Sequence, residues 1–226
     1  MKITHVVVAS FLGLLVATPA RSQGLIDGFS YNAAITGDST FDHPSIRGDE
    51  IDFFYSGGSG ITGSIDISGG TMTIGPMSYP GSFGTIEIFW DGNDNSAGNN
   101  GLGIGPVDLS GTAGLSFDVI SHANNELLGF ILTAFSGEVD FYEGNVGVSS
   151  YAPGTYFLPW SSFGQIGAPD LSQIRALRMA VVFFSETQTI EIDNFQVVPV
   201  PEPATWLLLG LGGAALAGIT RLRRKA

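Results

Sequence analysis

The stretch LSFDV at residues 115–119 shows most directly how this chain folds. Its apolar residues alternate with polar ones, which is typical of a β-strand with one face buried and the other in water. The same alternation recurs in IDIS at residues 65–68 and in IEIFW at residues 86–90. Residues 127–135 are instead apolar at nearly every position, which predicts a central strand buried on both faces.

Turns rich in glycine and asparagine separate these runs, at residues 57–60, 69–70 and 93–105. Many short strands with regular turns indicate a sandwich or a barrel. Residues 24–198 hold 27 glycines, near twice the usual fraction, and a glycine costs a helix interior roughly 1 kcal/mol relative to alanine. We therefore expect a β-sandwich domain over residues 24–198, with one helical turn that Asp170 caps before a strand near residues 179–184.

The charge and composition exclude several classes of protein. The chain has 9 basic and 21 acidic residues, a formal net charge of −12, and no cysteine. Residues 24–198 contain three arginines, 20 acidic residues and no lysine. This excludes P-loop and Schiff-base lysines, thiol nucleophiles, cysteine-ligated metals and disulfides. Such an acidic body repels phosphate backbones, so nucleic acid is not an expected partner, whereas cations are.

Residues 1–22 have the pattern of a secretory signal peptide. Lys2 precedes an apolar run at residues 6–17, and Ala20 and Ser22 are small enough for cleavage by signal peptidase. A buried N-terminal helix is the alternative, which the short length of the run disfavours.

Residues 199–226 contain three signals in order. The tripeptide Pro201-Glu202-Pro203 precedes the uncharged residues 204–220, which as a helix are about 25 Å long, the short limit for spanning a bilayer core. A basic cluster then stops transfer and places the tail in the cytoplasm, with the acidic body outside. The cluster consists of Arg221, Arg223, Arg224 and Lys225.

This order closely resembles the PEP-CTERM sorting signal of Gram-negative bacteria. The resemblance implies export, anchoring in the inner membrane in transit, removal of the helix by an exosortase, and delivery to the cell surface or extracellular matrix. It also implies an association with exopolysaccharide and biofilm. A permanent single-pass membrane anchor with a coincidental Pro-Glu-Pro is the alternative, and the tail alone does not distinguish the two.

Four segments of residues 105–198 resemble, in their order, the jelly-roll domains of carbohydrate-binding modules and of many PEP-CTERM proteins. The resemblance implies a jelly-roll-like antiparallel β-sandwich. Residues 24–104 match less clearly, which leaves the number of strands there open. The four segments are residues 108–119, 156–163, 170–179 and 190–195.

The same resemblance implies a structural calcium ion between the first and last strands, where the matching residues are Asp27 and Asp193. Strand phase adds support, because Ile192 and Phe195 have opposite parity and the strand must shift its register between them, as at a β-bulge. A carboxylate re-aimed by a bulge can bind calcium together with other oxygens. A solvated aspartate at an edge bulge is the alternative.

A second calcium candidate is the loop that follows residue 90. Asp91, Asn93 and Asn95 match positions 1, 3 and 5 of an EF-hand loop, but Ser96 and Leu102 stand where that loop needs glycine and glutamate. An ordinary polar turn is the alternative, since turns favour these residue types.

Aromatic side chains can stack on sugar rings. Trp90 ends a strand beside the polar loop and is the candidate for glycan binding. Trp160 lies in a segment with other aromatic residues, so we expect it in the core.

The sequence offers little for catalysis. His43 and His122 lack metal-like spacing, no Gly-x-Ser-x-Gly elbow exists, and residues 101–106 do not match a dinucleotide fingerprint. We therefore predict no enzyme but an exported surface or matrix protein, structural or binding, linked to exopolysaccharide. A specific glycan-binding module is one alternative, and a glycosidase with two carboxylates, which no pattern locates, is the other.

Overall fold

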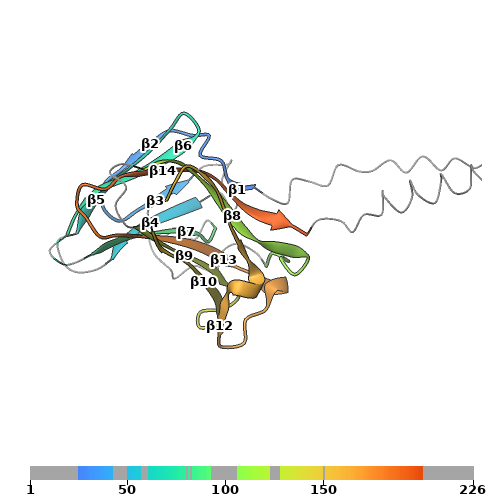
Figure 1. The fold of residues 1–226 in the computed structure, drawn as a ribbon. Helices are drawn as coiled ribbons and strands as arrows, with labels where there is room; N and C mark the ends of the chain where they lie inside the picture. The colour runs from blue at the N-terminus through green and yellow to red at the C-terminus, as the bar shows by residue number, and fades with distance from the viewer. Residues whose placement is uncertain are drawn as a thin grey trace, which may run out of the picture.

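The structure is a computed structural model that describes residues 25–42, 50–56, 61–79, 81, 83–92, 106–122, 128–149 and 151–200. Within these ranges the chain forms two antiparallel sheets packed against each other as a β-sandwich (Figure 1). The all-β architecture predicted from the alternating pattern is confirmed. The predicted signal peptide and membrane helix lie outside the described residues.

Sheet A has seven strands in the described part of the chain. The first strand, β1, pairs with the last, β14, at one side of the main path. The spatial order along that path is β11 (Gly154–Pro159), β8 (Thr112–His122), β14 (Ile190–Pro199), β6 (Thr71–Ser78), β5 (Thr62–Ser68) and β2 (Ala33–Ile35), with β1 spanning Leu25–Asp27.

Sheet B also has seven strands among the described residues, and all of its neighbouring pairs are antiparallel. Its spatial order is β12 (Gly164–Ile166), β10 (Phe141–Ser149), β9 (Leu128–Phe135), β13 (Ala176–Phe183), β7 (Gly84–Trp90), β4 (Glu50–Ser56) and β3 (Ser39–Asp42).

The predicted strands lie where their patterns placed them. LSFDV lies in β8, IDIS in β5 and IEIFW in β7. The continuous apolar run became β9, which pairs with β10 on one side and β13 on the other. Two short 3₁₀ turns, η1 (Trp160–Ser162) and η2 (Leu171–Gln173), complete the described elements. The Asp170 side chain caps η2, as predicted, by accepting a hydrogen bond from the Ser172 backbone N–H at 2.9 Å.

The core lies between the two sheets and is rich in aromatic rings. Phe117 of β8 and Phe130 of β9 lie 4.6 Å apart between ring centroids, and Trp90 of β7 lies 4.5 Å from Phe195 of β14. Each pair joins sheet A to sheet B, and all four side chains are at most 1% exposed. Such contacts between inner faces are what hold a sandwich together.

Side chains of opposite parity point to the outer faces. In β7, Ile86 and Ile88 are fully buried in the core, so Glu87 between them faces outward from sheet B. Directly paired residues of antiparallel strands share a face. The register of the strands therefore aligns outward residues of β4, β7, β13, β9 and β10 into rows across the sheet.

No helix in the described part of the chain is long and apolar enough to cross a membrane.

Candidate functional site

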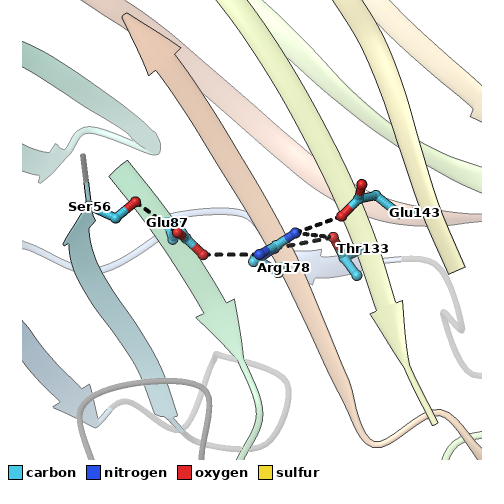
Figure 2. Close-up of polar contacts among 5 residues, drawn as sticks. All are labelled: Ser56, Glu87, Thr133, Glu143 and Arg178. Atoms are coloured by element: carbon cyan, nitrogen blue, oxygen red, sulfur yellow. Dashed lines mark hydrogen bonds and ion pairs between the residues drawn. The ribbon is translucent and has the colours of Figure 1, made fainter. Parts of the chain in front are cut away.

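A hydrogen-bonded row of polar side chains crosses the outer face of sheet B (Figure 2). At its centre is Arg178 of β13, which pairs in register with Thr133 of β9. Glu143 of β10 lies opposite Thr133 on the far side. Glu87 of β7 lies on the other side of Arg178, and Ser56 of β4 extends the row. Five neighbouring strands thus contribute one side chain each.

The guanidinium of Arg178 binds both carboxylates at once. Its Nη1 donates to Oε2 of Glu87 at 3.1 Å, and its Nη2 donates to Oε2 of Glu143 at 3.0 Å. Nε and Nη2 also donate to the hydroxyl of Thr133, at 3.1 and 2.8 Å. The Ser56 hydroxyl donates to Oε1 of Glu87 at 2.8 Å. The planar fork of arginine suits such multiple, directional bonding.

The row is held firmly at its centre and is more open at one end. The side chains of Arg178 and Glu87 are 18% and 19% exposed, whereas that of Glu143 is 38% exposed. Arg178 also lies 5.7 Å from the centroid of the Phe135 ring, close enough for a cation–π contact. Glu143 is therefore the carboxylate of the row that a ligand reaches most easily.

Aromatic rings flank the row on the same face. Phe135 lies 5.4 Å from Phe141 and 6.4 Å from Phe89, measured between ring centroids. Phe54 pairs in register with Glu87 and is 37% exposed. A sugar ring can form hydrogen bonds with carboxylates and with a guanidinium, and it can stack on partly exposed aromatic rings.

The geometry argues against Glu87 and Glu143 as a glycosidase pair. Both retaining and inverting enzymes keep the space between their two carboxyl groups for the scissile bond or a water molecule. Here Arg178 lies between the two carboxylates and bonds to both. This arrangement suits a binding surface better than a hydrolytic site.

An acidic cluster lies near the start of β4 and the end of β7. Glu50, Asp52 and Asp91 are each fully buried, and one oxygen from each lies within 4.8 Å of the others. Glu50 and Asp52 alternate with the core residues Ile51 and Phe53, so they belong to the outward parity of β4. The ladder between β4 and β7 brings Asp91 beside them. Three carboxylates this close can hold a divalent cation or must share protons.

Asp91 was predicted as a metal ligand from the loop pattern, together with Asn93 and Asn95, which lie outside the described residues. Glu50 and Asp52 were not predicted. The alternation of EIDF at residues 50–53 carried a signal for them, since it places two acids on one strand face. Their proximity to Asp91 depends on which strand pairs with β4, which the local pattern does not reveal.

Asp27 is a fully buried hydrogen-bond acceptor that joins the two sheets. Its Oδ1 accepts from the Phe29 backbone N–H at 2.8 Å, and its Oδ2 accepts from the Tyr31 hydroxyl at 2.7 Å and from Trp90 Nε1 at 3.2 Å. Burial raises the pKa of the Tyr31 hydroxyl above its ordinary range. The negative charge of Asp27 and the hydrogen bond from Tyr31 to Asp27 raise this pKa further. Asp27 is thus held by protein donors on the inner side of sheet A.

Asp193 lies at the predicted bulge. The register of β14 with β8 shifts between Asp193 and Gln196, and Asn194 has a φ of 51°. Asp193 pairs with Asp118, whose Oδ2 accepts from the Asn194 amide at 2.9 Å. This half-buried pair has the outward parity, opposite to the fully buried Ile192. Asp27 and Asp193 therefore face opposite sides of sheet A, and calcium on that pair stays a prediction.

The two tryptophans of the body lie in different surroundings. Trp90 is fully buried, packs on Phe195 and donates to Asp27, so the prediction that it stacks on a glycan is wrong. Trp90 has the same parity as Ile86 and Ile88, which already predicted an inward side chain. The prediction relied instead on the polar loop that follows Trp90. Trp160 packs 4.9 Å from Phe163, at the partly buried margin of the core.

Comparison with known proteins identifies a PEP-CTERM protein-sorting motif at residues 199–225. This confirms the resemblance of the C-terminal segment, including Pro201, Glu202 and Pro203. The sequence has no match among curated proteins.

Several solved structures resemble the fold. The family 11 carbohydrate-binding module of the cellulase Lic26A-Cel5E of Clostridium thermocellum is 14% identical, with 80% of this chain and 96% of that chain covered and a TM-score of 0.44. The family 12 xyloglucanase of Bacillus licheniformis is 12% identical, with 74% and 100% covered and a TM-score of 0.42. The agarase AgWH50C is 11% identical, with 66% and 22% covered and a TM-score of 0.44. These likenesses concern the fold alone.

Proposed function

We propose that this chain is an exported protein of a Gram-negative bacterium that binds polysaccharide through the outer face of sheet B. Its sorting signal would deliver it through the inner membrane, with exosortase and signal peptidase as processing enzymes, to the cell surface or the exopolysaccharide matrix. The role is structural or binding, not catalytic. The observation that carries the proposal is the row from Ser56 to Glu143 with its flanking aromatic rings.

The face has the properties that a neutral or cation-bridged glycan needs. Arg178 orders Glu87 and Glu143 in advance, so little side-chain entropy is lost when a ligand binds them. Phe54 and Phe141 add apolar surface beside these acceptors. A sheet face is open along its strands, which suits an internal stretch of a long polymer.

The test measures retention of the full chain in native gels that contain exopolysaccharide from a producing strain. We expect Phe141→Ala and Glu143→Ala each to weaken binding about fivefold to tenfold, because one ring contact or charged hydrogen bond contributes roughly 1 kcal/mol or more. Val139→Ala and Glu138→Ala are the matched controls in the neighbouring exposed loop, and they should bind like the wild type. Equal retention of all four variants would contradict the proposal.

The glycosidase alternative has a separate test. The assay measures the release of reducing ends from the same exopolysaccharide. Release by the wild type that is lost in Glu87→Gln and Glu143→Gln would show that the function is hydrolysis rather than binding.

We further propose that a structural calcium ion binds at the acidic cluster of Glu50, Asp52 and Asp91. Three carboxylates supply up to six of the six to eight oxygens that calcium takes. A divalent cation would also offset the repulsion among three buried negative groups. The sequence pattern had independently selected Asp91 as a calcium ligand.

A further inference from the structure

An open depression of about 730 Å³ lies at one end of the sandwich, and its described lining residues are not those of the row on sheet B. It is formed where β5 begins, β6 ends and the connection between β13 and β14 crosses them. Binding sites for small ligands are typically 300–1,000 Å³, so the depression has room for a short chain of sugar units rather than for a single ion.

The wall of the depression is held in place by its own hydrogen bonds. Gln188 is fully buried, and its Oε1 accepts from the backbone N–H groups of Phe184 and Ser185 at 3.0 and 3.2 Å. A Cβ atom at Gly75 of β6 would lie 2.3 Å from the Gln188 carbonyl oxygen. The connection therefore packs directly on the backbone of β6, and the depression is preformed.

The lining combines hydroxyl groups, an apolar floor and one carboxylate. Pro76 and Met77 of β6 provide the apolar surface. Among the described residues that line it, Glu186 is the charged one, and its Oε1 accepts from the Tyr79 backbone N–H at 3.4 Å. The hydroxyl groups belong to Thr36, Thr62, Ser78 and Thr187.

This lining selects a class of ligand. The described lining residues include one carboxylate and no basic side chain, so this part of the depression disfavours anions. Hydroxyl side chains both donate and accept, and a carboxylate accepts strongly from hydroxyl donors. A neutral sugar offers hydroxyl groups at its rim and C–H groups on its faces, which match the hydroxyl rim and the floor of Pro76 and Met77.

Two exposed aromatic rings lie at the same end of the sandwich. Phe183 pairs with Gly84, so the next residues along the two strands are Phe184 and Phe83, which are 43% and 48% exposed. Phe184 begins the connection that contains Glu186. Such rings can extend the contact with a sugar chain that leaves the depression.

We infer that this depression is a second glycan site, which binds a short neutral oligosaccharide independently of the face of sheet B. The inference rests on the proposed function in that both ligands are glycans, but the two sites share none of the residues that the structure describes. The polymer crosses the open sheet face, and a short or terminal stretch of sugar occupies the depression.

The experiment is calorimetric titration of the full chain with cellotetraose, in a detergent without a sugar headgroup. We expect Glu186→Gln to weaken binding about tenfold, as loss of a charged hydrogen-bond acceptor does. Thr187→Trp should strongly weaken binding because the indole takes up space in the depression that the sugar chain would occupy. The matched controls Glu138→Gln and Ser161→Trp, at exposed positions elsewhere, should bind like the wild type. Tetragalacturonate, an anionic chain of the same length, should bind at least about tenfold more weakly than cellotetraose.

The outcomes separate the two proposals. Wild-type affinity in both Glu186→Gln and Thr187→Trp, or equal affinity for tetragalacturonate, would overturn the second site. If Thr187→Trp fails to fold in a thermal melt, Glu186→Gln alone decides. Loss of cellotetraose binding in Phe141→Ala and Glu143→Ala, with the depression variants unaffected, would overturn the second site and leave the sheet face standing. Loss in the depression variants with polymer binding unaffected would support two separate sites.

Discussion

The carboxyl of Asp193 shows how one outward residue influences stability. Burial, with a further contribution from the charge of Asp118, raises its pKa above the ordinary value of 3.8, although the Asn194 backbone N–H partly offsets this. In the folded protein this group therefore holds its proton to higher pH than in the unfolded chain. The free energy of unfolding falls as the pH rises from about 3.8 through the raised pKa, and it stays lower above that value.

Asp193→Asn should therefore stabilise the protein at pH 7 in the presence of chelator. The gain should be less than about 1 kcal/mol, or about 2–4 °C in Tm, because the pair is only half-buried. Below pH 3 the gain should vanish, because the Asp193 carboxyl is then protonated in both the folded and the unfolded chain. Thermal melts of the variant and wild type across this range are the measurement. A variant less stable than wild type only when calcium is added would instead support Asp193 as a calcium ligand.

At the scale of elements, β4 and β7 bring acids together that no local pattern connects. Residue 91 follows directly after β7, whereas Glu50 opens β4, and the antiparallel ladder joins the two ends. All three carboxylates of the cluster are withdrawn from water and lie close together, so their negative charges repel one another in a medium of low polarity. The ends of these two strands are thus the part of sheet B whose stability should depend most on a cation.

Calcium should raise the Tm of the full chain, and a chelator should lower it. A ligand that binds only the folded state adds about 2.7 kcal/mol when its free concentration is 100 times the Kd. Glu50→Gln and Asp52→Asn should each remove most of this calcium dependence, whereas Asp66→Asn, an exposed acid on β5, should not. A melt that is the same in millimolar calcium and in excess EDTA would eliminate the calcium proposal.

At the scale of the whole molecule, the sandwich runs directly into its sorting motif. Strand β14 ends at Pro199, still paired with Thr112 of β8, and the matched motif begins at the same residue. Only Val200 separates the strand from Pro201. Residues 204–220 are the segment that we propose anchors the protein in transit, and only the four residues 200–203 separate it from the strand. Four residues span at most about 14 Å, so we expect the folded body of the anchored form to lie close to the membrane.

A flexible insertion at this junction should speed processing. Six Gly/Ser residues between Val200 and Pro201 should relieve crowding between the sandwich and the membrane-embedded enzyme. The measurement is the intact mass of the protein from cell surface and medium over time, where the processed form lacks residues 1–22 and those beyond about Pro203. The same insertion after Val139, an exposed loop residue, is the control. An unchanged rate in both would contradict crowding, and a mass that retains residues 206–226 would indicate a permanent anchor.

Much of this molecule could be predicted from short-range patterns. Period-two alternation located β5, β7 and β8, the parity change between Ile192 and Phe195 located the bulge in β14, and the order of the C-terminal segments located the sorting motif. These features are local, because a side chain's face on a strand depends only on its position in the alternation.

The candidate site could not be predicted in the same way. Arg178 meets partners that are 91 and 35 residues away in the sequence, Glu87 and Glu143. Alternation says that such residues face outward, but not which strands lie side by side. The order β10-β9-β13-β7-β4 in sheet B makes them neighbours. The sequence by itself determined the class of fold, the faces of the strands and the C-terminal sorting motif. Only the tertiary structure decided which outward residues meet, because strand pairing joins distant segments through the packing of the whole sandwich.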